Sequence, residues 1–103
     1  LLLLSWIFGE ILLGDEGMEL LAPLLQHLTS LASFALLYNK IGFEGLNILA
    51  SVLHHLTFLT SLNLSWNKLG VDEMILLAPA MKYLTSLSSL SLDGNKLEDE
   101  GIS

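Results

Sequence analysis

Apolar and polar positions recur along this chain with a fixed period of 28 residues. Leucine holds one register of the repeat and asparagine another, in the sets Leu36, Leu64, Leu92 and Asn39, Asn67, Asn95. Such a period is typical of stacked repeats, in which each unit buries its apolar face against its neighbours. We therefore expect one repeat array over residues 1–103, with units at about 1–27, 28–55 and 56–83 and a partial unit at 84–103.

Within each unit the pattern changes from a strand to a helix. Leu62, Asn63 and Leu64 alternate between apolar and polar, which is the spacing of a strand with its leucines facing inward. Asn67 follows, and its side chain can bond backbone groups that a turn leaves unpaired, so its repetition predicts an asparagine ladder. Helical spacing comes next, in Met74, Leu77, Ala78 and Met81.

The order of these elements predicts an α/β fold. Successive strands must be parallel because each connects to the next through a helix on one face of the sheet. Strands stack more closely than helices do, so we expect a curved sheet on the concave side and helices on the convex side. Pro23 and Pro79 fall about two turns into their helices, where we expect them to kink, shorten or break the helix.

The spacing Leu-x-x-Leu-x-x-Leu-x-Leu-x-x-Asn-x-Leu resembles the leucine-rich repeat family. It is carried by Leu56, Leu59, Leu62, Leu64, Asn67 and Leu69, and again by Leu84, Leu87, Leu90, Leu92, Asn95 and Leu97. The repeat length and the stretch at residues 14–23 resemble the ribonuclease-inhibitor-like class, and in particular the repeat arrays of NOD-like receptors in innate immunity. The resemblance implies a leucine-rich repeat solenoid that recognises a protein partner, although such folds host many functions.

The charge of the chain excludes several classes of partner. The formal net charge is −7, and the four basic residues are all lysines. That balance argues against nucleic acid and against anionic membrane surfaces. The chain has no cysteine, which excludes disulfides and cysteine-ligated zinc and fits a reducing compartment, so we expect a cytoplasmic protein.

The outward positions of the strands form the default binding surface for a protein partner. They are mostly small and uncharged: Ser33, Ala35, Leu37, Ser61, Asn63, Ser65, Ser89, Ser91 and Asp93. A floor of this kind has little specificity of its own, so the alternative is a solvated sheet that binds nothing.

Aromatic residues occupy the position just past two of the strands. Tyr38 and Trp66 stand there, while Glu10 and Gly94 hold the same register in the outer units. Exposed Tyr and Trp side chains are frequent anchors of protein interfaces. Packing of these rings against the neighbouring turn is the competing interpretation.

Neither catalysis nor a metal site is indicated. The acidic residues come one cluster per unit rather than as a catalytic pair, and the sequence has no glycine-rich phosphate loop. His27 and His55 share a register beside His54, but one helix spacing of about 10 Å is too long for direct ligation at about 2 Å. We therefore expect no catalytic residue, no metal and no cofactor.

Two further functions stay open. A Ran-type GTPase-activating array needs a polar and acidic cluster along one rim, and only Glu10 and Asp93 come near that. A purely structural spacer would need no ligand on its sheet.

Both ends of the array depart from the pattern. Residues 1–13 are strongly apolar, with Ile11 at the asparagine position, and a unit of this kind should not face water alone. At the other end the last helix has barely begun at Ser103, and no polar capping unit follows. We therefore expect a fragment of a longer array, or end-to-end self-association through uncapped terminal units.

Overall fold

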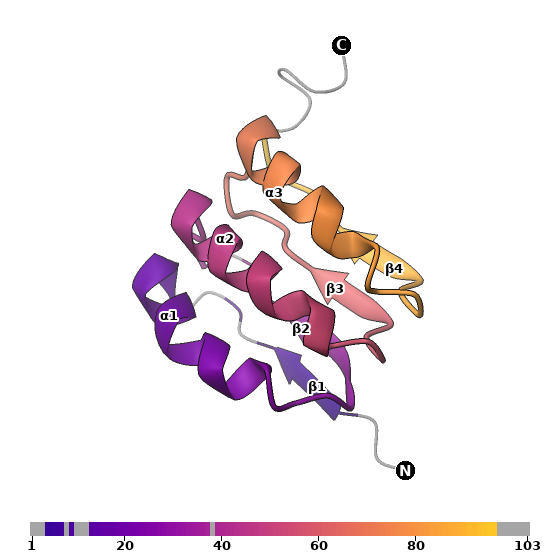
Figure 1. The fold of residues 1–103 in the computed structure, drawn as a ribbon. Coiled ribbons are helices and arrows are strands. Elements are labelled where there is room, and N and C mark those ends of the chain that lie inside the picture. The colour runs from indigo at the N-terminus through magenta and orange to yellow at the C-terminus, as the bar shows by residue number, and fades with distance from the viewer. Residues whose placement is uncertain (1–3, 8, 10–12, 38, 97–103) are drawn as a thin grey trace.

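Strands and helices alternate along the chain (Figure 1). The computed structural model describes residues 4–7, 9, 13–37 and 39–96. The strands are β1 (Leu4–Ile7), β2 (Leu31–Ala35), β3 (Ser61–Asn63) and β4 (Ser89–Ser91). The helices are α1 (Gly14–Leu25), α2 (Phe43–Val52) and α3 (Val71–Met81), and a short 3-10 helix, η1 (Leu53–His55), extends α2.

The strands form one parallel sheet in the order β1-β2-β3-β4. Strands β2, β3 and β4 pair in the register of the repeat, so that Ser33 lies beside Ser61, and Ser61 lies beside Ser89. Between β1 and β2 the register shifts by one residue at Leu4 and Ser5. The parallel arrangement predicted from the strand–helix order is therefore confirmed.

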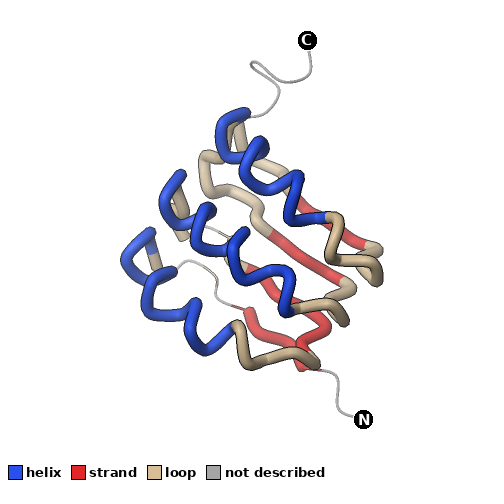
Figure 2. Tube along the Cα trace, viewed as in Figure 1, coloured by secondary structure: helices blue, strands red, loops and turns tan. Residues whose placement is uncertain are grey.

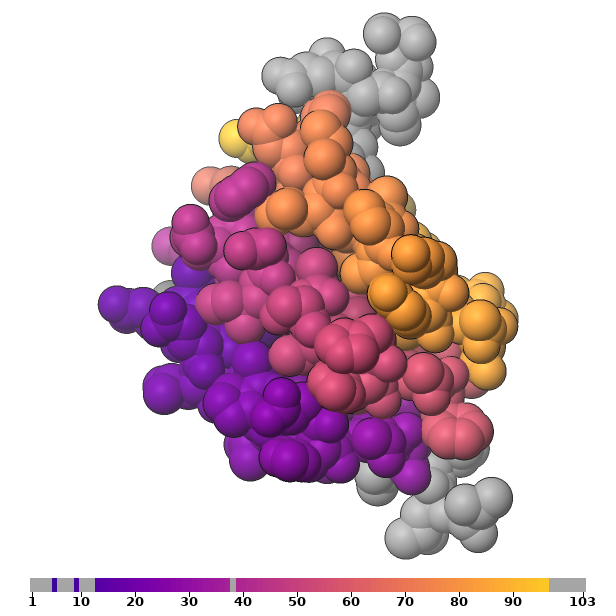
Figure 3. All heavy atoms as spheres, viewed as in Figure 1, coloured from indigo at the N-terminus to yellow at the C-terminus, as the bar shows by residue number. Residues whose placement is uncertain are grey.

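The helices cover one face of this sheet (Figure 2). The space-filling view from the same side shows the atoms of successive units packed next to one another in chain order (Figure 3). The core lies between the two layers and is built from inward leucines of the strands and from one side of each helix, with Phe34, Leu36, Leu62, Leu64, Met18, Leu46, Leu49 and Leu77 among its buried members. Over the described residues, no helix has the length and apolar content needed to cross a membrane.

The predicted asparagine ladder is confirmed, and Asn67 shows how it is bonded. The Asn67 Oδ1 atom accepts bonds from the backbone N–H groups of Asn39 at 3.0 Å and Ile41 at 3.1 Å. Its Nδ2 group donates to the carbonyl of Leu36 at 2.9 Å and to that of Leu64 at 3.1 Å. Asn67 is buried, so these bonds replace water for backbone groups that the turns would otherwise leave unpaired.

Each asparagine carbonyl in the ladder serves the preceding turn. Asn39 Oδ1 accepts from the N–H of Leu13 at 3.2 Å, and Asn95 Oδ1 accepts from those of Asn67 at 3.0 Å and Leu69 at 2.9 Å. The direction is the same at every step, so the turns are joined in a defined order along the stack.

The carboxylates at the helix starts also bond backbone. Asp15 Oδ1, in the first turn of α1, accepts from the N–H of Gly42 at 2.7 Å, just before α2. Glu73 Oε1, in the first turn of α3, accepts from the N–H of Gly70 at 2.7 Å. A negative charge at these positions complements the helix dipole as the sequence predicted, and Asp15 additionally joins one unit to the next.

The expected breaks at the helix prolines do not occur. α1 and α3 run on through Pro23 and Pro79 and end two residues later, at Leu25 and Met81. Both prolines are exposed, so water can bond the carbonyl that each one leaves without a helical donor. Of the expected effects a break is wrong, because a proline costs little near the exposed end of a helix. Shortening agrees with the helix ends at Leu25 and Met81.

Candidate functional site

The sheet face opposite the helices carries the predicted floor of small side chains. We call this the open sheet face and define it by the outward residues of β2, β3 and β4: Ser33, Ala35, Ser61, Asn63, Ser89 and Ser91. Within the described residues no helix packs on it, and all three helices lie on the other side (Figure 1). Ser89 is exposed, and Ser33, Ser61, Asn63 and Ser91 are half-buried by their neighbours along the sheet.

Ala35 and Ser65 are not exposed, contrary to expectation. Ala35 retains 8% of its accessible surface and Ser65 retains 5%. Ala35 sits in a central strand beside Asn63, and its single methyl group does not rise above the floor. Ser65 lies beyond the end of β3, where its N–H bonds Asn63 Oδ1 at 3.0 Å and the chain turns under the sheet edge. Strand alternation stops applying there.

Two other predicted residues frame the floor. Leu37 is half-buried, and a side chain at Gly9 would come within 3.8 Å of it. Asp93 is exposed, and its carbonyl accepts a bond from the N–H of Trp66 at 2.8 Å. The backbones of Asp93 and Trp66 are therefore joined just past the strand ends, and the Asp93 residue is open to solvent there.

Trp66 is both packed and exposed. Its side chain lies over Gly94 of the next turn, where an added Cβ would come within 2.1–2.4 Å of three indole ring atoms. Nevertheless, 49% of the residue remains accessible. Packing and exposure had been alternatives, and the structure combines them: the next turn seats the ring and leaves about half of it available.

The other half of the predicted aromatic pair is not described. Tyr38 and Glu10 both lie outside the described residues. Among the described residues, the predicted surface therefore consists of the open sheet face with Leu37, Trp66 and Asp93.

The histidines lie away from this surface, at the ends of the helices. His54 and His55 have ring centroids 3.9 Å apart, and the His54 ring is 5.8 Å from that of Tyr83. His27 is exposed one unit earlier. In the part of the chain that the structure describes, no three His, Cys, Asp or Glu side chains gather closely enough to hold a metal ion.

Comparison with known proteins agrees with this geometry. A family model described as leucine-rich repeat matches residues 55–78 and 83–103. The search of curated proteins gave no match for this chain. Leucine-rich repeats generally mediate protein–protein interaction and are typically non-enzymatic binding modules. The two matched segments are thus similar to leucine-rich repeats, and the parallel strands with helices on one face fit an α/β fold of that kind.

Proposed function

We propose that this chain is a protein-recognition module whose partner binds the open sheet face, with Trp66 as the main anchor. One observation carries the proposal: a seated, half-exposed indole stands beside a floor of small side chains. A floor without bulky residues lets a partner backbone approach closely. An indole already held against Gly94 loses less side-chain freedom on binding than a mobile one does.

The size of this surface limits what it can bind alone. The three strands of the open sheet face contribute about three residues each and are spaced by about 4.8 Å, so they offer a floor on the order of 150 Å². A stable protein interface buries about 800 Å² on each partner. We therefore infer that the partner also covers Trp66, Asp93 and the open sheet face of further repeats in a longer array.

The finer assignments are part of the same proposal. We place the chain in the ribonuclease-inhibitor-like class, among cytoplasmic arrays of the kind that NOD-like receptors carry. The open sheet face is then concave, because strands spaced by about 4.8 Å face helices that need about 10 Å. End-to-end association of terminal turns remains a prediction of this assignment.

The test compares three variants of the immobilised chain by the proteins that each retains from a cell extract. Ser61→Arg places a long cation in the open sheet face, and Trp66→Ala removes the anchor. Ala78→Arg is the matched control, because Ala78 is exposed on α3 in the helical layer. We expect proteins retained by the unmodified chain to be lost from the first two variants and kept by the third.

Two results would contradict the proposal. Loss of the same proteins from the Ala78→Arg variant would move the binding surface to the helices. Full retention by the Ser61→Arg variant would leave the sheet without a binding role, as expected of a structural spacer. Circular dichroism of each variant shows whether the fold has been kept.

A further inference from the structure

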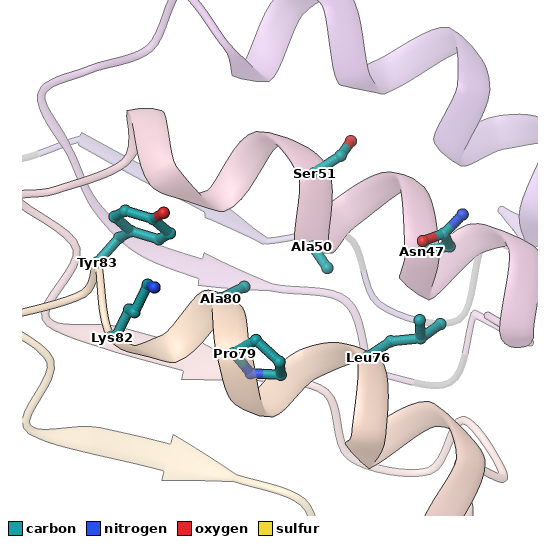
Figure 4. A pocket seen from close by; sticks show the side chains of 8 residues that line it. All are labelled: Asn47, Ala50, Ser51, Leu76, Pro79, Ala80, Lys82 and Tyr83. Carbon is teal, nitrogen blue, oxygen red and sulfur yellow. The ribbon is translucent and has the colours of Figure 1, made fainter.

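A groove of about 280 Å³ lies between α2 and α3, on the opposite side of the molecule from the open sheet face. Figure 4 shows its lining, with Asn47 and Leu76 at one end and Lys82 and Tyr83 at the other. Pro79 lies in the middle of its floor. We refer to it as the α2–α3 groove.

Small side chains create this groove. Neighbouring helices need side chains to fill a spacing of 8–10 Å, but here Ala50, Ser51 and Ala80 meet. One unit earlier, Val52 occupies the register of Ala80. The hollow is therefore a property of this boundary rather than of the repeat in general.

The two ends of the groove also differ in charge. Of its eight lining residues only Lys82 is charged, and its Nζ atom lies 5.3 Å from the centre of the Tyr83 ring. The carboxylates in the first turns of α2 and α3 belong to the other ends of these helices: Glu44, Asp72 and Glu73. The negative end of the α3 helix dipole lies next to Lys82, but it offsets only about half of the unit charge of the lysine.

The equivalent position in the preceding boundary has the opposite character. Glu19 stands one unit before Asn47, so the α1–α2 boundary carries a carboxylate where the α2–α3 groove has a neutral amide. A negatively charged ligand would be repelled there. In a chain of net charge −7, the α2–α3 groove is thus an uncommon place with an apolar floor and a cation at one end.

We propose that the α2–α3 groove binds a short extended peptide segment in which an apolar side chain precedes a carboxylate by two residues. The apolar side chain packs on Ala50, Pro79 and Ala80, and the carboxylate pairs with Lys82. Alternate residues of an extended peptide face the same side about 7 Å apart. Pro79 and Lys82 are separated by about 4.5 Å along the α3 axis, at about 1.5 Å per residue, and the long lysine side chain can cover the remaining distance.

A peptide fits the dimensions better than a compact small molecule does. Pockets for whole small molecules hold about 300–1,000 Å³ and enclose most of the ligand. The α2–α3 groove is smaller and open to solvent along α2, where Asn47 and Ser51 are exposed. It therefore has room for one or two side chains of a longer ligand. This site is separate from the open sheet face, so the two proposals stand or fall independently.

The experiment is an NMR titration of the isotopically labelled chain with the blocked peptide acetyl-Leu-Ala-Glu-amide. We expect millimolar binding, with shift changes confined to the backbone amides of residues 47–51, 76–78 and 80–83. The control peptide acetyl-Leu-Ala-Gln-amide has the same shape without the charge. It should bind about two- to fivefold more weakly, the range expected for one exposed ion pair.

Two variants locate the site. Lys82→Gln should reduce the affinity for the acidic peptide to that for the neutral peptide. Lys68→Gln should leave the affinity unchanged, because Lys68 precedes α3 and does not line the groove. Ala80→Val should abolish binding by filling the groove, and the register of Val52 indicates that the fold accepts valine there. Equal affinity for both peptides, or shift changes outside the groove, would overturn the proposal. So would undiminished binding to a folded Ala80→Val variant.

Discussion

The seat of Trp66 on Gly94 gives the sharpest test of the structure, through the substitution Gly94→Ala. Gly94 has φ +72°, and a Cβ there would lie 2.1–2.4 Å from the indole, a distance at which the ring must move. Gly14 provides a matched control. Its φ is +66°, and an added Cβ meets nothing within 4 Å. Gly14→Ala therefore carries the backbone strain without the collision.

The two substitutions should differ by about the energy of the ring contact. Alanine in the left-handed region costs about 1–2 kcal/mol, and this applies to both sites. If displacing the Trp66 ring exposes roughly 50 Å² of apolar surface, about 25 cal/mol per Å² adds about 1 kcal/mol at Gly94 alone. For a chain of this size, about 1 kcal/mol lowers the melting temperature by roughly 4–8 °C.

The measurement is thermal and urea unfolding followed by circular dichroism, with both substitutions repeated in a Trp66→Ala background. The extra cost of Gly94→Ala over Gly14→Ala should disappear in that background, because no ring remains to be displaced. An equal cost of the two substitutions in the unmodified chain, or an excess that persists without the indole, would refute the proposed seat.

Three further substitutions test the backbone and its polar contacts by the same unfolding measurements. Asn67→Ala should lower the free energy of unfolding by about 3–5 kcal/mol, because it leaves several buried backbone groups unpaired. Asn95→Ala should cost less, because the environment of Asn95 is only partly buried. Equal costs would contradict the ladder. Lys68→Gly should stabilise the fold by up to about 1 kcal/mol, because it relieves the backbone strain of φ +62°. Lys82→Gly should destabilise the fold, because φ −64° carries no such strain. A change of stability with the same sign at both positions would be inconsistent with strain at Lys68. Asp15→Ala should cost about 1–2 kcal/mol and Asp15→Asn much less, since an amide oxygen can still accept the bond; equal losses would argue against it.

The fold could be predicted from the sequence because its period sets several structural relationships at once. A strand that recurs every 28 residues through a helix can only pair in parallel, and Ser61 and Ser89 pair as that period requires. The asparagine ladder follows from the same register, since Asn39 and Asn67 meet only when their turns stack. In a stack of this kind, the same sequence period predicts both the elements within a unit and the contacts between units.

The errors arose where an element ends. β3 is only three residues long, so alternation does not reach Ser65, which is buried in the turn instead. Pro79 was judged as a helix-interior proline, but α3 ends two residues later. Boundaries depend on turn geometry and solvent access, which the spacing of apolar residues does not encode.

The candidate sites depended on differences between units rather than on the repeat. Gly94 appeared only as a gap in the aromatic register, although the missing side chain is what makes room for Trp66. The α2–α3 groove was missed for a similar reason. The sequence indicates this groove only through Ala80, which stands at the repeat position that Val52 holds one unit earlier. The smaller side chain gains a meaning only when the structure places α2 and α3 side by side.

The one-way bonding of the asparagine ladder implies an order of disassembly. The side-chain oxygen of each asparagine accepts bonds from backbone N–H groups of the preceding turn. Loss of a later turn therefore leaves the earlier turn with unpaired backbone donors. Loss of an earlier turn costs the ladder less. The Nδ2 groups of Asn67 and Asn95 lose the carbonyls of Leu36 and Leu64, but they keep those of Leu64 and Leu92 in their own units. Fraying should therefore spread backward from the turn that carries Asn95, and hydrogen exchange at Asn67 should report it before exchange at Asn39 does.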